Sequence, residues 1–124
     1  MDWKDEVISD VGKGMGIDEL NFSGSGVIKF QFESDGELCI ESREDRVLFY
    51  LTRQVAHHNL LDIITKALKY CHYSQAIKFP LQVGLKGNEN LFLCSFLENE
   101  SFNRPNIENL IETITAQFNK LTEL

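Results

Sequence analysis

The sequence predicts an α+β fold, in which a mostly antiparallel, twisted sheet carries packed helices and the chain forms a homodimer. The first indication is the order of patterns along the chain, α-β-β-β-α-β-β-α. The second is that two strands, Val47–Leu51 and Leu91–Leu97, are apolar on both faces. A small antiparallel sheet normally has one solvent-exposed face, so apolar and polar residues alternate along its strands. These two strands therefore need a second cover, which could be a helix of the same chain, a second copy or another protein.

The first predicted element is an amphipathic helix. Its apolar residues recur at helical spacing and form one stripe: Trp3, Val7, Ile8, Val11 and Met15. Glycines weaken the end of this pattern, and Gly16 stands where a helix C-cap is expected. The helix should therefore end near Gly16 with one face buried.

Three strands are predicted next, at Val27–Glu33, Glu37–Ser42 and Val47–Thr52. Asp35-Gly36 is a strong hairpin signal, because a type I′ turn needs positive φ at both central residues. A charged turn, Arg43–Arg46, precedes the third strand. Alternate residues of the first two strands are expected to face the core: Ile28, Phe30, Phe32, Leu38 and Ile40.

The second half of the chain predicts a helix, a strand pair and a final helix. Asn59 is a good N-cap for the middle helix. The apolar stripe of this helix consists of Leu60, Leu61, Ile64, Ala67, Leu68 and Cys71. The strands are Phe79–Leu85 and Leu91–Leu97, and Pro105 suits the first turn of the last helix. The stripe of that helix consists of Ile107, Leu110, Ile111, Ile114, Phe118 and Leu121.

Length, charge and cysteine content limit the class of protein. A chain of 124 residues is expected to be one domain, residues 1–124. Its net charge of -7 argues against nucleic acid and anionic membranes as partners, because their phosphates would repel it. No apolar run approaches a membrane span, and the charged start lacks the apolar core of a signal peptide. Three widely spaced cysteines form neither a CxxC pair nor a disulfide framework, so we expect a cytoplasmic protein.

No catalytic, cofactor or metal signature stands out. His58 and Asp62 have the i,i+4 spacing that can chelate a metal, with His57 beside them and Cys71-His72 further along. A second matched pair such as CxxC or HExxH is missing, so a surface histidine pair is the preferred interpretation. Cys71 and His72 are helix neighbours that point about 100° apart, so they form no nucleophilic dyad by themselves. We expect no enzyme activity, no cofactor and no metal.

The chain resembles a known family in its element order and in three segments. Val7–Ile17 looks like that family's opening helix, which runs into a short glycine-containing turn. The hairpin Phe30–Ile40 and the stretch Leu60–Leu68 also stand where the family has equivalent elements. The family is that of the class I chaperones of bacterial type III secretion, the Tir-chaperone family. The resemblance covers nearly the whole chain, and size and acidity agree with it.

The resemblance implies a non-enzymatic, ATP-independent chaperone in the bacterial cytoplasm that acts as a homodimer. Such proteins bind the N-terminal segment of a secreted effector, the client, in extended form and keep it soluble and competent for export. A disordered client can bury apolar side chains in surface grooves and pair with a sheet edge. The cost of ordering it is offset only by a long interface.

Two separate surfaces are expected on this basis. The client-binding surface combines the first helix with the first three strands and uses Trp3, Val7, Phe22, Leu48 and Tyr50. The dimer interface uses the middle helix and the last two strands, with Leu61, Ile64, Leu68, Phe92, Cys94 and Phe96.

Two other functional classes remain open from the sequence. One is a small acidic immunity or antitoxin-like protein that binds a folded, usually basic toxin through an acidic patch. The other is a small enzyme or ligand-binding domain with a closed internal pocket, which would require convergent polar groups in the core. The sequence contains no such polar set, and a neighbouring effector gene or toxin gene would separate the first two classes.

Overall fold

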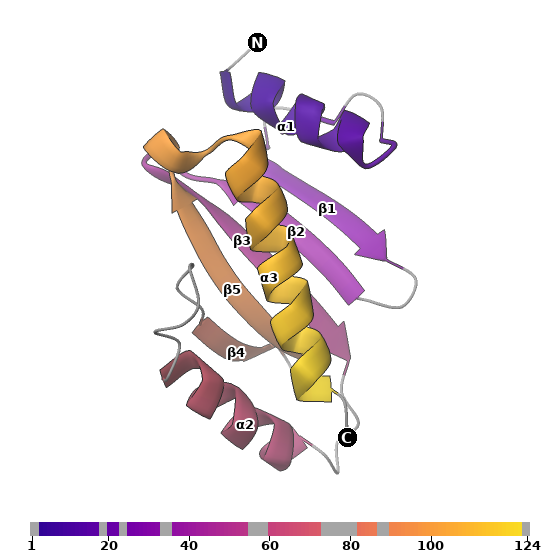
Figure 1. The fold of residues 1–124 in the computed structure, drawn as a ribbon, viewed down its shortest axis with the longest axis vertical. Coiled ribbons are helices and arrows are strands. Elements are labelled where there is room, and N and C mark those ends of the chain that lie inside the picture. Colours follow the sequence, from indigo (N-terminus) through magenta and orange to yellow (C-terminus); the bar gives the residue numbers. More distant parts are fainter. Residues whose placement is uncertain are drawn as a thin grey trace.

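The computed structural model describes residues 3–17, 20–22, 25–32, 36–54, 60–72, 82–86 and 90–122. The predicted order of helices and strands is confirmed (Figure 1). The elements are α1 (Trp3–Gly14), β1 (Val27–Phe32), β2 (Gly36–Ser42), β3 (Arg46–Gln54), α2 (Leu60–His72), β4 (Gln82–Lys86), β5 (Asn90–Glu98), the short 3-10 turn η3 (Asn99–Ser101) and α3 (Arg104–Thr122).

The strands form one five-stranded antiparallel sheet in the order β1-β2-β3-β5-β4. The first three strands are consecutive in the sheet, as predicted. The predicted two-residue turn at Asp35-Gly36 is wrong, because Gly36 is the first residue of β2 and pairs with Phe32. β5 then pairs with β3 along its whole length, so β4 lies at the edge of the sheet. Two strands that are far apart in the sequence, β3 and β5, therefore become neighbours at the centre.

One side of the sheet, which we call the inner face, carries the core. Burial alternates strictly along β3 and β5, where every second side chain is buried. α3 crosses this face (Figure 1) and seals it with Ile107, Leu110, Ile114 and Phe118, all at most 1% exposed. Phe49 at the centre of β3 is fully buried among them.

The opposite side, which we call the outer face, carries half-buried residues on β3 and β5 instead of exposed polar ones. It consists of Val27, Lys29 and Gln31 on β1, Glu37, Cys39 and Glu41 on β2, Leu48, Tyr50 and Thr52 on β3, and Phe92, Cys94 and Phe96 on β5. The prediction that β3 and β5 are apolar on both faces is thus confirmed.

α1 is fastened to the sheet by polar contacts as well as by its apolar stripe. Ile8 and Val11 are buried in the core. The buried Lys4 donates through Nζ to the carbonyl of Arg43 at 2.8 Å, and Asp5 accepts a hydrogen bond from the Phe22 backbone N–H at 2.9 Å. The helix ends as predicted, because Gly16 adopts φ 80° and the Ile17 N–H donates back to the Gly12 carbonyl at 2.7 Å.

The inward side of α2 agrees with the predicted stripe at Ile64, which packs against the core, but differs at two other positions. Ile63, which the predicted stripe omits, is 2% exposed, whereas Leu61 is 76% exposed. The helix packs against β4 and α3, and Lys66 Nζ donates to the Lys120 carbonyl at 2.8 Å. The packing of α2 against β4 and α3 turns the side that carries Ile63 and Ile64 inward and leaves Leu61 in solvent. The side chains of Ala67, Leu68 and Cys71 lie outside the described residues.

β3 is longer than predicted, and only part of the predicted range of β4 is described. β3 continues to Gln54, and Arg53 is buried on the inner face with its guanidinium 4.7 Å from the Phe118 ring. An arginine can occupy such a position because its flat guanidinium stacks on an aromatic ring. β4 is described from Gln82, and the predicted start at residues 79–81 lies outside the described residues. Leu85 on β4 is 46% exposed.

Candidate functional site

The candidate site lies on the outer face, where the strand register aligns side chains from separate strands. Tyr50 on β3 pairs with Cys39 on β2 and with Cys94 on β5. On the same face Leu48 pairs with Phe96, and Thr52 pairs with Phe92. We call the apolar part of this face the apolar band, defined as Leu48, Tyr50, Phe92, Cys94 and Phe96.

The apolar band joins residues that the sequence assigned to two different surfaces. Leu48 and Tyr50 were expected to bind a client, and Phe92, Cys94 and Phe96 were expected to form a dimer interface. The structure places all five on β3 and β5, which pair directly. These five residues therefore form one continuous surface.

Aromatic contacts order the band. The rings of Tyr50 and Phe92 meet edge to face with their centroids 5.9 Å apart. The Arg46 guanidinium lies 4.8 Å from the centroid of the Phe96 ring and is held there by Asp45, which accepts its hydrogen bonds at 3.2 and 3.3 Å. The same hydrogen bonds lower the pKa of Asp45. Each of these rings therefore packs against a neighbour on the same face of the sheet.

The polar atoms of the band remain uncharged near neutral pH. Burial raises the pKa of the Tyr50 hydroxyl and that of the Cys94 thiol above their ordinary values of 10.0 and 9.0. A raised pKa leaves Cys94 protonated, and a thiol is a poor nucleophile compared with a thiolate. Cys94 therefore contributes packing surface to the band.

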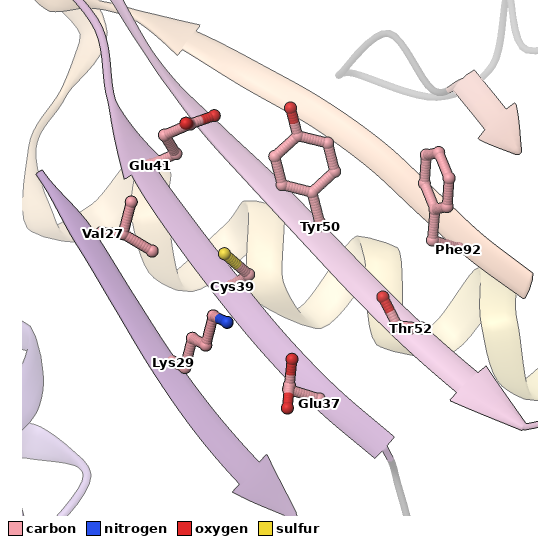
Figure 2. A pocket seen from close by; sticks show the side chains of 8 residues that line it. All are labelled: Val27, Lys29, Glu37, Cys39, Glu41, Tyr50, Thr52 and Phe92. Carbon is pink, nitrogen blue, oxygen red and sulfur yellow. The ribbon is translucent and has the colours of Figure 1, made fainter. Parts of the chain in front are cut away.

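A pocket of about 390 Å³ opens beside the band, over β1, β2 and β3 (Figure 2). Figure 2 shows its side chains rising from the strands while α3 runs behind the sheet. The pocket is lined by Val27, Lys29, Glu37, Cys39, Glu41, Tyr50, Thr52 and Phe92. This pocket was not predicted, because its walls come from four strands that only the folded sheet brings together.

Gly84 determines where the Phe92 ring lies. Gly84 is the β4 residue opposite Phe92, and a Cβ atom built on it would overlap that ring. Because Gly84 has no side chain, the Phe92 ring can lie across the β4 backbone at this point. A single glycine thus shapes one wall of the pocket.

The remaining residues predicted to bind a client lie near α1. Trp3 is 44% exposed. Its ring and the Phe102 ring, next to the start of α3, meet edge to face with their centroids 5.9 Å apart. Val7 is half-buried against the core. Phe22 is only 6% exposed and packs near Phe102. Phe22 therefore belongs to the core, and we remove it from the proposed surface.

The predicted metal-ligand candidates are only partly visible in the structure. His57 and His58, as well as the side chains of Cys71 and His72, lie outside the described residues. Within the described part of the chain, no three His, Cys, Asp or Glu residues gather closely enough to hold a metal ion. None of the described helices is long and apolar enough to cross a membrane.

Comparison with known protein families gives a match over almost the whole chain. The model of the type III secretory system chaperone SycN family matches residues 3–120. The chain belongs to this family. SycN chaperones of Yersinia enterocolitica and Yersinia pseudotuberculosis are each 25% identical to it over 114 residues, covering 92% of both chains. The family resemblance expected from the element order is confirmed.

Solved structures confirm the fold. A chain of the ExsC–ExsE complex aligns over 100% of this chain and 96% of its own, with a TM-score of 0.77 at 10% identity. A chain of the HopA1–SchA chaperone–effector complex aligns over 96% and 92%, with a TM-score of 0.74 at 11% identity. A chain of the ExoU–SpcU complex of the Pseudomonas aeruginosa type III secretion system aligns over 93% and 94%, with a TM-score of 0.67 at 17% identity.

Proposed function

We propose that this protein is a non-enzymatic, ATP-independent chaperone of type III secretion that binds the N-terminal segment of a secreted effector. It keeps that segment soluble and competent for export in the bacterial cytoplasm. Family membership over residues 3–120 supports the chaperone role. The observation that carries the binding role is the apolar band, whose five side chains are half-buried rather than buried.

The band is suited to a client without a folded core of its own. Large apolar side chains that remain accessible on one sheet face mark an interaction surface. Each client side chain buried there contributes about 1–3 kcal/mol. Trp3 and Val7 on α1 remain proposed client contacts outside the band, and Trp3 is 44% exposed.

We also propose that the chain forms a homodimer through α2. The supporting observation is Leu61, an apolar side chain that is 76% exposed on a helix whose other side is packed. Leu68 is the proposed neighbour of Leu61 in this interface, and Ile64, which packs against the core, would contribute only its accessible part. A stable interface should bury more than about 1,000 Å² in total. Phe92, Cys94 and Phe96, which the sequence assigned to this interface, are proposed here as part of the client-binding band.

The proposal is tested by co-expression with the N-terminal segment of the effector encoded next to its gene. We expect the tagged chaperone to retain the segment through purification and to keep it soluble. The purified complex should form without nucleotide. Failure to retain any unfolded segment, together with tight binding of a folded toxin, would contradict the proposal and support an immunity protein.

A further inference from the structure

The pocket beside the apolar band combines aromatic walls with carboxylates. The rings of Tyr50 and Phe92 stand on its β3–β5 side, and Glu37 and Glu41 stand on its β2 side (Figure 2). Its volume of about 390 Å³ is near the lower end of the range for ligand pockets, about 300–1,000 Å³. This volume is suited to one long side chain of a bound segment and not to a large cofactor.

Two carboxylates and one amine line the pocket. Glu37 and Glu41 outnumber Lys29, the one basic residue among the lining side chains. Glu41 is held at 3.1 Å by Arg43 through its Oε2 atom. Glu37 forms no ion pair with any residue in the described part of the chain. One carboxylate therefore remains available to a partner's cation.

We propose that this pocket receives one arginine or lysine side chain of the bound effector segment, next to apolar residues that cover the band. This inference rests on the chaperone function proposed above and specifies the chemistry of its client. The aliphatic stem would lie over Val27 and Cys39, and the cationic head would lie between the Glu37 carboxylate and the two rings. A cation over an aromatic face is attracted by the ring's quadrupole, and a neighbouring carboxylate adds to that attraction.

Charge complementarity supports a basic effector segment as the occupant. The chain carries a net charge of -7, so a basic segment is attracted to it at long range. The band and the pocket share Tyr50 and Phe92. A segment with an apolar residue beside a basic one can therefore fill both at once.

A random dodecapeptide library displayed on phage, selected on the immobilised full-length protein, tests this inference. We expect the retained peptides to be enriched in arginine or lysine next to large apolar residues. A synthetic consensus peptide should bind about fivefold more weakly when its basic residue is replaced by neutral citrulline. Glu37→Gln with Glu41→Gln should weaken binding of the basic peptide by a similar factor and leave binding of the citrulline peptide unchanged.

Two further variants separate charge from shape. Gly84→Ala keeps every charge but displaces the Phe92 ring from the pocket wall. It should therefore also weaken binding of the basic peptide by about fivefold. Glu112→Gln on the exposed side of α3 removes the same kind of charge far from the pocket and should leave binding of the basic peptide unchanged. Circular dichroism establishes that each variant is folded.

The outcomes distinguish this inference from the chaperone proposal. The basic pocket is overturned if purely apolar peptides are enriched. It is also overturned if the basic peptide binds the Glu37→Gln, Glu41→Gln variant as tightly as it binds the wild-type protein. Either result leaves the chaperone function standing. Retention of no peptide at all, together with loss of effector co-purification, contradicts both. If the Glu37→Gln, Glu41→Gln variant sediments differently from the wild-type protein but binds the peptide equally well, a second copy occupies the pocket. This result also overturns the inference.

Discussion

At the scale of single residues, neighbours on one strand have opposite roles. Phe49 is fully buried on the inner face, where it packs in the core. Tyr50, the next residue, lies half-buried on the outer face against Phe92. The alternation of side chains along a strand separates the two roles. Stability and partner binding can therefore be changed independently on β3 and β5.

Phe49→Ala and Phe96→Ala should show this separation. Phe49→Ala leaves a cavity in the core and should lower the free energy of unfolding by about 3–5 kcal/mol. Phe96→Ala removes a half-buried ring and should cost about 1 kcal/mol, while weakening effector capture. Urea unfolding followed by circular dichroism measures both costs. Equal losses of stability would contradict the assignment of the two faces.

The raised pKa values of Tyr50 and Cys94 predict a loss of stability in alkali. Burial favours the neutral forms, so the folded state holds these protons to higher pH than the unfolded state does. Their contribution is complete below the unfolded pKa values and is lost as pH rises above about 9 through the folded values. Tyr50→Phe with Cys94→Ala should show a smaller drop in urea midpoint between pH 8 and pH 10.5. An unchanged drop would contradict the burial of these groups.

At the scale of elements, the sequence predicted the order of helices and strands because periodicity and turn residues are local signals. Gly16 and Pro105 mark helix ends regardless of what surrounds them. The Asp35-Gly36 pair correctly indicated a hairpin but not its register, because Gly36 pairs with Phe32. The inward side of α2 was not predictable in the same way. Leu61 and Ile63 are both apolar, and only the contact of α2 with β4 and α3 decides between them.

The two α2 residues should respond differently to the same substitution. Leu61→Asp places a charge on a side chain that is 76% exposed and should leave the subunit folded while dissociating the proposed homodimer. Ile63→Asp buries a charge without a partner and should unfold or strongly destabilise the chain. Sedimentation at micromolar concentration, with circular dichroism, separates these effects. A wild-type protein that sediments as a monomer would contradict the dimer.

At the scale of the whole molecule, the sequence predicted the composition of the site but not its layout. Tyr50, Phe92 and Phe96 were recognisable as excess apolar residues because they stand opposite core residues. That they form one surface depends on the pairing of β3 with β5 across about 40 residues of chain, which periodicity does not encode. The pocket and the role of Gly84 depend on the same register.

The central claim is that the apolar band holds the effector segment. The most direct test is co-expression of the neighbouring effector's N-terminal segment with Tyr50→Asp, Phe96→Asp chaperone, followed by quantitative co-purification. A matched control adds the same two charges to exposed positions of α3, through Asn109→Asp and Ala116→Asp. We predict that the wild-type and control proteins retain the segment and that the folded band variant loses it. Normal retention by a folded band variant would contradict the account.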